Sequence, residues 1–166
     1  MKMPATLPVI ALGLVLLLSQ ATAASIDTLP NFKLKLVDGT VLDSRDLTGK
    51  VTVIDFWGTW CKPCLTEIPS YNQFYQAYRE KNVRFVALAT DSGTRDEIRD
   101  AVKRLKIEYP VAAPSWTELD KFGNIEAFPT TLIFDARGKL VKEFIGVPAD
   151  KHPSIRRIVD GLLASK

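Results

Sequence analysis

The two cysteines of this 166-residue chain, Cys61 and Cys64, are its only ones and stand three positions apart in the segment WGTWCKPC at 57–64. The apolar run 51–57 leads directly into this segment, and a helical pattern follows it. The chain must therefore fold so that a buried strand delivers both thiols to the start of a helix. Since this spacing brings the two sulfurs within reach of each other, it predicts a dithiol/disulfide switch.

A helix N-terminus makes Cys61 the expected reactive thiolate. The unpaired backbone N–H groups and the positive end of the helix dipole stabilise an anion there, and Lys62 adds a positive charge beside it. Pro63 fixes the backbone where a missing N–H costs nothing. Cys64, nearly one turn further on, is expected to point back toward the protein body as the resolving thiol. We therefore expect the sulfur of Cys61 to be exposed and nucleophilic.

Other uses of two close cysteines fit the chain less well. A structural disulfide usually joins distant segments, and so small a loop gives little stabilisation through loop entropy. A zinc site needs four ligands, whereas the sequence offers one CxxC pair and a single histidine, His152. Covalent haem attachment requires a histidine where Leu65 stands, and the Thr-x-x-Cys pattern of a peroxidatic cysteine is absent. We expect no metal and no cofactor.

The first 23 residues have the pattern of a secretory signal peptide. A positively charged start precedes a short apolar run, and Ser-Gln-Ala-Thr-Ala at 19–23 has the small-x-small shape of a cleavage site. We predict cleavage after Ala23, or after Ala24, which leaves one domain over residues 24–166. The apolar run is short for a membrane span, although an uncleaved membrane anchor is the alternative. The mature protein is then expected in the periplasm, or anchored to the membrane and facing it.

Composition places the mature chain among ordinary globular domains. Hydrophobic residues make up 46% of the sequence and charged residues 25%. Without the signal peptide, 21 basic residues face 19 acidic ones, so the net charge is +2. A charge this small and this evenly spread does not argue for nucleic acid as a partner. The length suits one domain with a sizeable core.

Strand patterns recur along the mature chain. Residues 32–37 alternate apolar and polar, and a turn at 38–39 leads them back into 40–42, which predicts an N-terminal hairpin. A loop is expected at 46–50. Further strands are expected at 51–57, 83–89, 110–112, 130–134 and 140–145, of which the last two form a second hairpin.

Helical patterns fill the segments between these strands. The helix after the cysteines is expected to bury one stripe and to kink at Pro69; the stripe consists of Leu65, Ile68, Tyr71, Tyr75 and Tyr78. Capping-box patterns at 94–97 and 115–118 start two more helices, and Gly123 is expected to end the second of these. A last helix carries apolar residues over 155–163. These elements predict one α/β domain, a central mixed β-sheet flanked by helices on both faces.

Two motifs resemble signatures of the thioredoxin-like family. The pattern DFWxxWCxPC at 55–64, followed by Pro69, resembles the active-site segment of the thioredoxin fold, and Phe-Pro-Thr-Thr at 128–131 resembles the loop that carries its cis-proline. The signal sequence, the N-terminal hairpin, the run Cys-x-x-Cys-x-x-Glu-x-Pro and an inserted βα segment at roughly 91–123 are similar to the exported TlpA/ResA-like thiol-disulfide oxidoreductases. The resemblance covers nearly all of residues 30–163.

This resemblance implies roles for particular residues. Cys61 would be the nucleophile and Cys64 the resolving thiol, joined as the redox-active disulfide. Pro129 would lie cis against that disulfide, and the backbone beside it, with Phe128 and Thr130, would bind a substrate strand. The resemblance also implies reduction of protein disulfides outside the cytoplasm, as in cytochrome c or copper-site assembly, with a membrane thiol reductase as electron donor. Because the Lys-Pro dipeptide does not fix the direction, an oxidant or isomerase is the alternative.

Further side chains near the motif are candidates for the site. Asp55 lies in an apolar strand, where a buried carboxylate of raised pKa could accept the proton of Cys64; the alternative is a strand-end residue paired to a lysine at the sheet rim. Glu67, one turn past Cys64, could perturb the thiols or contact substrate, or else be a solvated or dipole-stabilising acid. Trp60 is expected to form an apolar lip beside the first cysteine, with simple packing as the alternative, and His152 is expected to be a surface residue without a role.

Two functions of other classes stay open. One is a non-catalytic binding or chaperone module that keeps the fold and uses its groove for partner contacts. The other is a metallochaperone that binds copper through the two sulfurs, although the sequence lacks the distal histidine expected of one. A reduction potential measured with turnover separates the first from an enzyme, and a copper titration tests the second.

Overall fold

The computed structural model describes residues 26–165, so the predicted signal peptide and its cleavage site lie outside the described residues. The strands are β1 (Lys33–Lys35), β2 (Val41–Asp43), β3 (Val51–Trp57), β4 (Val83–Ala89), β5 (Val111–Ala112), β6 (Thr130–Phe134) and β7 (Leu140–Ile145). The α-helices are α1 (Lys62–Tyr78), α2 (Arg95–Arg104), α3 (Trp116–Leu119) and α4 (Lys151–Ala164). Two short 3-10 helices are η1 (Ser44–Leu47) and η2 (Asp120–Phe122).

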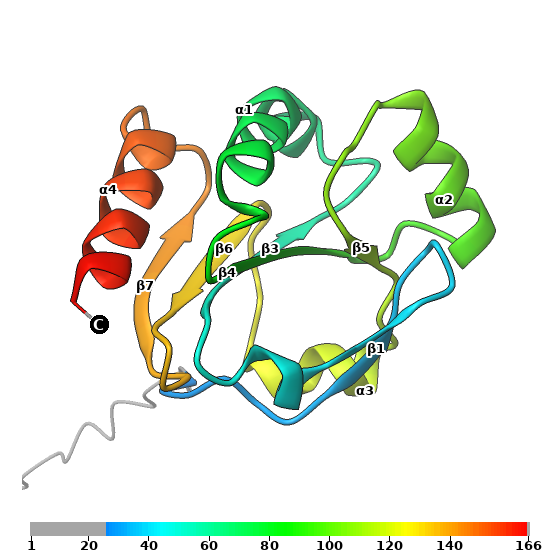
Figure 1. The fold of residues 1–166 in the computed structure, drawn as a ribbon. Coiled ribbons are helices and arrows are strands. Elements are labelled where there is room, and N and C mark those ends of the chain that lie inside the picture. Colours follow the sequence, from blue (N-terminus) through cyan, green and yellow to red (C-terminus); the bar gives the residue numbers. More distant parts are fainter. Residues whose placement is uncertain (1–25, 166) are drawn as a thin grey trace, which may run out of the picture.

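The main sheet has the strand order β5-β4-β3-β6-β7, and β1 and β2 pair as the predicted N-terminal hairpin. β3 runs parallel to β4 and antiparallel to β6, which makes the sheet mixed. Helices α1, α2 and α4 lie over one face of this sheet, whereas α3 and the hairpin lie against the other (Figure 1). The predicted α/β fold, with a central mixed sheet between helices, is confirmed.

Strand β3 is central because both of its faces are covered. All seven of its residues are buried, which explains why its sequence is apolar almost without interruption. Alternate side chains of the strand join two separate clusters. Val53 and Trp57 pack below α1 and α4, whereas Ile54 and Phe56 pack against the hairpin and α3. Asp55 is the one ionisable residue of the strand, and by this alternation it faces α1.

The helices begin largely where their capping residues predict. Thr94 and Ser115 each cap a helix through a reciprocal capping box, and Gly123, at φ +80°, ends the turn that follows α3. The expected loop at 46–50 is wrong in its first part, since η1 covers it as far as Leu47. The side chain of Asp43 caps η1 by accepting from the backbone of Arg45.

The predicted buried stripe of α1 is partly wrong. Ile68, Tyr71 and Tyr78 are buried as expected, whereas Leu65 and Tyr75 are only partly buried. Phe74 and Glu67 are buried in addition, because α1 packs against both the sheet and α4 and therefore buries a wider face than one stripe. Pro69 lies within the continuous helix, and the kink stays a prediction.

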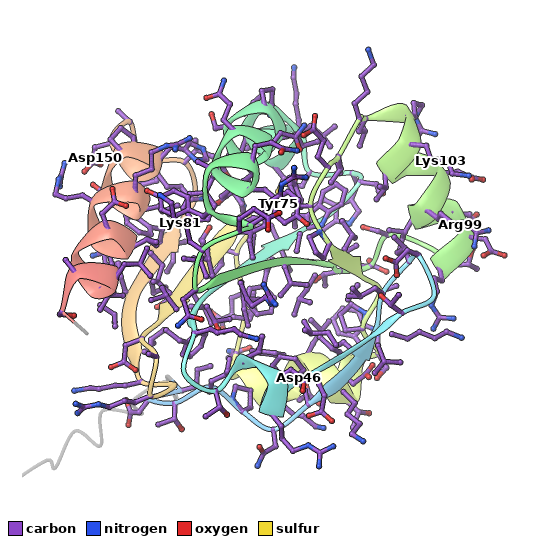
Figure 2. The ribbon with its side chains drawn as sticks, in the orientation of Figure 1. Asp46, Tyr75, Lys81, Arg99, Lys103 and Asp150 are labelled. Carbon is purple, nitrogen blue, oxygen red and sulfur yellow. A yellow bond between two sulfur atoms is a disulfide. The ribbon has the colours of Figure 1, made fainter. Side chains whose placement is uncertain are left out.

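Charged side chains cover the outward face of α2. Arg99 and Lys103 point away from the fold (Figure 2). Among residues 26–165, no helix combines the length and apolar character that a membrane-spanning helix needs.

Candidate functional site

The two cysteines lie where β3 passes into α1, and they are joined by a disulfide. Their Cα atoms are 5.3 Å apart. Cys61 is the N-cap of α1, and its sulfur accepts from the backbone N–H of Cys64 at 3.3 Å. This sulfur therefore occupies the place where the free N–H groups of the helix converge and where the helix dipole favours negative charge. Pro63 lies in the first turn, where it removes no intrahelical hydrogen bond.

Neither cysteine is exposed in this disulfide form, since each retains 4% of its accessible surface. The expectation of an exposed Cys61 sulfur is therefore wrong for the oxidised state. The disulfide bond to Cys64 and the hydrogen bond from the backbone N–H of Cys64 hold the Cys61 sulfur against the first turn of α1. Both cysteines belong to the buried apolar cluster below α1.

An aromatic pair stands beside the disulfide. Trp60 is 56% exposed, and its ring meets Phe128 edge to face at a centroid distance of 5.5 Å. The indole Nε1 donates to the carbonyl of Thr90 at 3.2 Å, which fixes the direction of the ring. Trp60, the residue before Cys61, thus forms an exposed aromatic surface with Phe128, and its use as an apolar lip for the substrate stays a prediction.

The segment after Phe128 carries the cis peptide bond that the resemblance implies, at Phe128-Pro129. The Pro129 carbonyl accepts from the backbone N–H of Gly146 at 2.8 Å. The side chain of Thr130 is buried, and its hydroxyl donates to the Ala127 carbonyl at 2.8 Å. This leaves Thr130 only its main chain for a substrate strand, and that contact stays a prediction.

Asp55 is buried in mid-strand and 3% exposed, between Ala87 of β4 and Thr131 of β6. The alternative of a strand-end residue at the sheet rim is therefore wrong. Tyr71 donates to Oδ1 of Asp55 at 3.1 Å, and Thr131 donates to the same oxygen at 2.8 Å. Burial raises the pKa of Asp55 to about 7; the charge of Glu67 adds to this, while Lys151 and the two hydroxyls oppose it.

The number of hydrogens available for hydrogen bonds around Asp55 agrees with a carboxyl whose pKa is raised. Tyr71 Oη and Thr131 Oγ1 are also 2.8 Å from each other, so three oxygens make three mutual contacts. Two hydroxyls supply two hydrogens, which leaves one contact unfilled when Asp55 is ionised. A protonated Asp55 supplies the third hydrogen. Burial also raises the pKa of Tyr71 well above its ordinary value, so its phenol keeps its proton.

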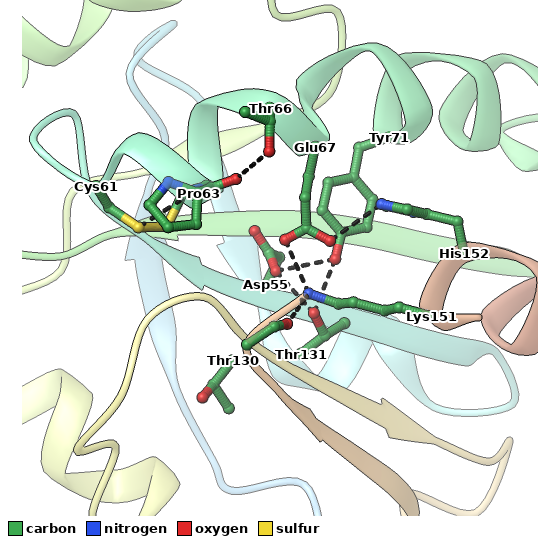
Figure 3. Close-up of polar contacts among 12 residues, drawn as sticks. Asp55, Cys61, Pro63, Thr66, Glu67, Tyr71, Thr130, Thr131, Lys151 and His152 are labelled. Carbon is green, nitrogen blue, oxygen red and sulfur yellow. Dashed lines mark hydrogen bonds and ion pairs between the residues drawn. A yellow bond between two sulfur atoms is a disulfide. The ribbon is translucent and has the colours of Figure 1, made fainter. Parts of the chain in front are cut away.

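Glu67 lies at the centre of a second buried group, drawn in Figure 3 beside Asp55. The residue is 2% exposed, and its Oε2 accepts from Lys151 Nζ at 2.9 Å. Its Oε1 is 3.0 Å from Nε2 of His152. A solvated or dipole-stabilising acid is therefore excluded, whereas an influence on the thiols stays a prediction. His152 is not a plain surface residue either, because its side chain is 23% exposed and its ring packs against Tyr71 at 4.8 Å.

Sequence reasoning missed Lys151 altogether, and it took Tyr71 only as a core residue. Lys151 is fully buried, and it also donates to the carbonyl of Gly146 at 3.1 Å. One signal could have revealed it: Lys151 is the first residue of α4, where the helix dipole disfavours a cation. A lysine at that position needs a partner, and the partner, Glu67, lies 84 positions away.

The arrangement can exchange electrons through sulfur and move a proton nearby. A disulfide at a helix N-terminus suits thiolate chemistry, and burial raises the pKa of the nearby Asp55 to about 7, a value suited to proton transfer near neutral pH. Over residues 26–165, no three His, Cys, Asp or Glu side chains gather as a metal site requires.

Comparisons with known proteins agree with this arrangement. The redoxin family matches residues 24–159 of the chain. The thiol-disulfide oxidoreductase ResA of Bacillus cereus is 37% identical over 117 residues, which are 70% of this chain and 67% of that protein. ResA of Bacillus subtilis is 29% identical, over 70% of this chain and 65% of its own length. The crystal structure of a thioredoxin-family thiol:disulfide interchange protein from Chlorobium tepidum superposes with a TM-score of 0.74 at 28% identity, covering 86% of this chain and 99% of that one.

The raised pKa of Asp55 predicts a stability difference that depends on pH. Because the pKa rises from 3.8 to about 7 on folding, the native state binds an extra proton in this window, and wild-type stability falls as pH rises through it. The side chain of Asp55→Asn cannot titrate. The free energy of unfolding of this variant, relative to that of the wild type, should therefore rise by up to about 1.4 kcal/mol per pH unit between about pH 4 and 7. Above that window the difference should level off. Urea unfolding from pH 4 to 8.5 measures it.

The matched control is Asp100→Asn, the same substitution at an exposed position of α2. The difference in free energy of unfolding between Asp100→Asn and the wild type should not rise between pH 4 and 7. A constant difference between Asp55→Asn and the wild type across the whole range would contradict a carboxyl that titrates near neutrality.

Gly58 is expected to be required for the position of the Trp60 ring. A Cβ at Gly58 would lie 2.6 Å from both Cε2 and Nε1 of Trp60, so Gly58→Ala should displace the indole from Thr90 and Phe128. The exposed ring can swing away, so stability should change by about 1 kcal/mol or less. The indole N–H resonance reports the move. Gly161→Ala, which meets no atom within 4 Å, is the control and should leave this resonance in place. An unmoved resonance in Gly58→Ala would refute the steric argument.

Proposed function

This chain belongs to the redoxin family and is a thiol-disulfide oxidoreductase, and we propose that it reduces disulfides of protein substrates outside the cytoplasm through Cys61 and Cys64. The observation that carries the proposal is the disulfide at the N-terminus of α1, with the Cys61 sulfur as the helix cap. Reduction of this bond would free a sulfur that the helix N-terminus stabilises as a thiolate.

The proposed cycle starts from the reduced dithiol. The Cys61 thiolate attacks one sulfur of a substrate disulfide, the substrate S–S bond breaks, and a mixed disulfide forms while the leaving thiolate takes up a proton. Cys64 then loses its proton to Asp55 and attacks the Cys61 sulfur. This attack breaks the mixed disulfide, the second substrate sulfur leaves as a thiolate that takes up a proton from Asp55 or from water, and the Cys61–Cys64 disulfide remains. Overall the two protein sulfurs give two electrons to the substrate, and the two protons that the dithiol loses balance the two that the substrate thiols gain.

Asp55 is the proposed acceptor for the Cys64 proton because its surroundings suit the task. A general base works best when its pKa lies near the working pH, and burial brings the pKa of Asp55 to about 7. Its side chain faces α1, the helix that carries Cys64. A direct transfer and a transfer through water both fit this role.

The substrate is proposed to lie across the aromatic lip and the cis-proline segment. Trp60 offers an exposed apolar surface, and Phe128 extends it to Pro129. A polypeptide that presents a cysteine can bind there by apolar contact and by pairing with the backbone beside Pro129. An extended protein segment is therefore the proposed substrate.

The oxidised protein needs an external dithiol to reduce it again, and we assign this to a membrane thiol reductase. A dithiol outside the cytoplasm must be maintained against an oxidising environment. Relatives named ResA are thiol-disulfide oxidoreductases, and a structural relative from Corynebacterium glutamicum is described as a secreted thiol-disulfide isomerase. Assembly of cytochrome c or of copper sites is the pathway we propose, and the opposite, oxidising direction is the alternative.

The two cysteines should give opposite defects when changed to serine. Cys61→Ser removes the nucleophile and should abolish reduction of insulin disulfides. Cys64→Ser keeps the nucleophile but lacks the resolving thiol, so it should accumulate a mixed disulfide with the substrate, visible by mass spectrometry without reductant. Circular dichroism of both variants controls for folding. Full insulin reduction by Cys61→Ser would refute the assignment of the nucleophile.

Export predicts a new N-terminus. Expression in a bacterium with a periplasm, followed by intact-mass measurement, should find a protein that begins at Ala24, or one residue later, in the periplasmic fraction. A membrane-bound protein that retains the apolar segment would favour the anchored alternative. An intact chain in the cytoplasm would refute export.

A further inference from the structure

The proposed reaction gives no role to one buried ion pair, which Lys151 forms with Glu67. The Lys151 side chain is 0% exposed and the Glu67 side chain 1%, and Nζ and Oε2 are 2.9 Å apart. Burial of two charges is costly, and replacing such a pair by apolar residues often leaves stability equal or higher. Stability alone therefore gives no reason for this pair, whose glutamate lies three positions after Cys64 on α1.

The pair lies in a compact polar layer to which four elements contribute. Figure 3 shows the carboxylates of Asp55 and Glu67 and the ammonium of Lys151 directed toward a common space. The titratable groups that face Asp55 and Glu67 are Tyr71 of α1, Tyr109 before β5, and Lys151 and His152 of α4, with the hydroxyl of Thr131 from β6 beside them.

Charge balance in this layer depends on Lys151. When both carboxyls are ionised, two negative charges share one buried ammonium. The charge of Glu67 raises the pKa of Asp55, and the charge of Lys151 lowers it. Removing the ammonium would leave two buried carboxylates facing each other, a state that holds on to a proton.

We propose that Lys151 is a positioning residue for the exchange reaction: it holds Glu67 in place and sets the pH at which Asp55 can accept the proton of Cys64. The inference rests on the proposed function, in which Asp55 is that acceptor. Lys151 reaches the layer from the first turn of α4, and its second bond, to the carbonyl of Gly146, fixes the ammonium between the end of β7 and α1. In this role Lys151 acts on the reaction through the two carboxylates and not by contact with a sulfur.

The test compares Lys151→Met, Glu67→Gln and the double variant. The carboxyl carbons of Asp55 and Glu67 are followed by NMR over pH 4 to 10 in the disulfide form, where no turnover is needed. In a second measurement, the reduced protein is mixed with a substrate disulfide, and the release of the second substrate thiol from the mixed disulfide is timed over the same pH range. Lys103→Met, a loss of the same charge at an exposed position of α2, is the matched control (Figure 2).

The two single variants are expected to move the titration in opposite directions. Lys151→Met should raise, by at least about one pH unit, the midpoint at which the carboxyl pair loses its last proton, because the cation is gone. Glu67→Gln should lower the midpoint of Asp55, because the neighbouring anion is gone and the cation remains. The double variant should fall between them, and Lys103→Met should match the wild type. The pH profile of release should move with each midpoint.

Several outcomes would overturn the inference. Midpoints that stay within about 0.3 pH unit of the wild type, or that move in the same direction in both single variants, would show that Lys151 only fills space. Midpoints that move while the release profile does not would show that the pair does not govern proton transfer. If Lys151→Met does not fold, Lys151→Gln, which removes the charge but keeps a polar head group for Glu67 and the Gly146 carbonyl, takes its place with the same expected direction. A wild type that releases no substrate thiol at any pH would instead refute the proposed function.

Discussion

The constraint on which this structure depends is a carboxylate placed in the middle of a buried strand. Asp55 cannot be solvated there, so other elements must supply its partners: Tyr71 from α1, Thr131 from β6, and the charge of Lys151 from α4. These interactions connect the helices α1 and α4, which cover β3, and the neighbouring strand β6 to one carboxyl of β3. The same burial that demands partners brings the pKa of Asp55 to about 7, so the structural cost of this carboxyl and its proposed role as proton acceptor have one origin.

The sheet separates this chemistry from the rest of the fold. The face of β3 below α1 carries Asp55 and Trp57 and leads to the disulfide, whereas the other face packs apolar side chains against the hairpin and α3. Because parallel pairing with β4 and antiparallel pairing with β6 hold β3 on both edges, the start of α1 is carried on a rigid support. The position of the Cys61 sulfur then follows from local helix geometry rather than from a mobile loop.

Local patterns predicted the local features well. The bounds of β3, β4, β6 and β7 followed from runs of β-branched and apolar residues, and two capping boxes marked helix starts, because each depends on neighbours in sequence. Of the polar layer, the sequence singled out Asp55 and Glu67 as candidates, and only Asp55 as a buried group. Its other members come from segments as far apart as Glu67 and Lys151, and no periodicity relates positions 84 residues apart. His152 was misplaced for the same reason, since its exposure depends on how α4 docks on Tyr71.

The lip beside the disulfide joins three separate stretches of chain. Trp60 precedes the cysteine, Thr90 follows β4, and Phe128 precedes the cis-proline; one hydrogen bond and one ring contact connect them. None of these contacts involves a sulfur or the buried carboxyls. If this lip binds the substrate as proposed, substitutions at Trp60, Thr90 or Phe128 would alter which polypeptides bind while the buried carboxyls keep their contacts. Recognition and proton transfer would then be separate parts of the molecule, which is how one scaffold can serve different substrates.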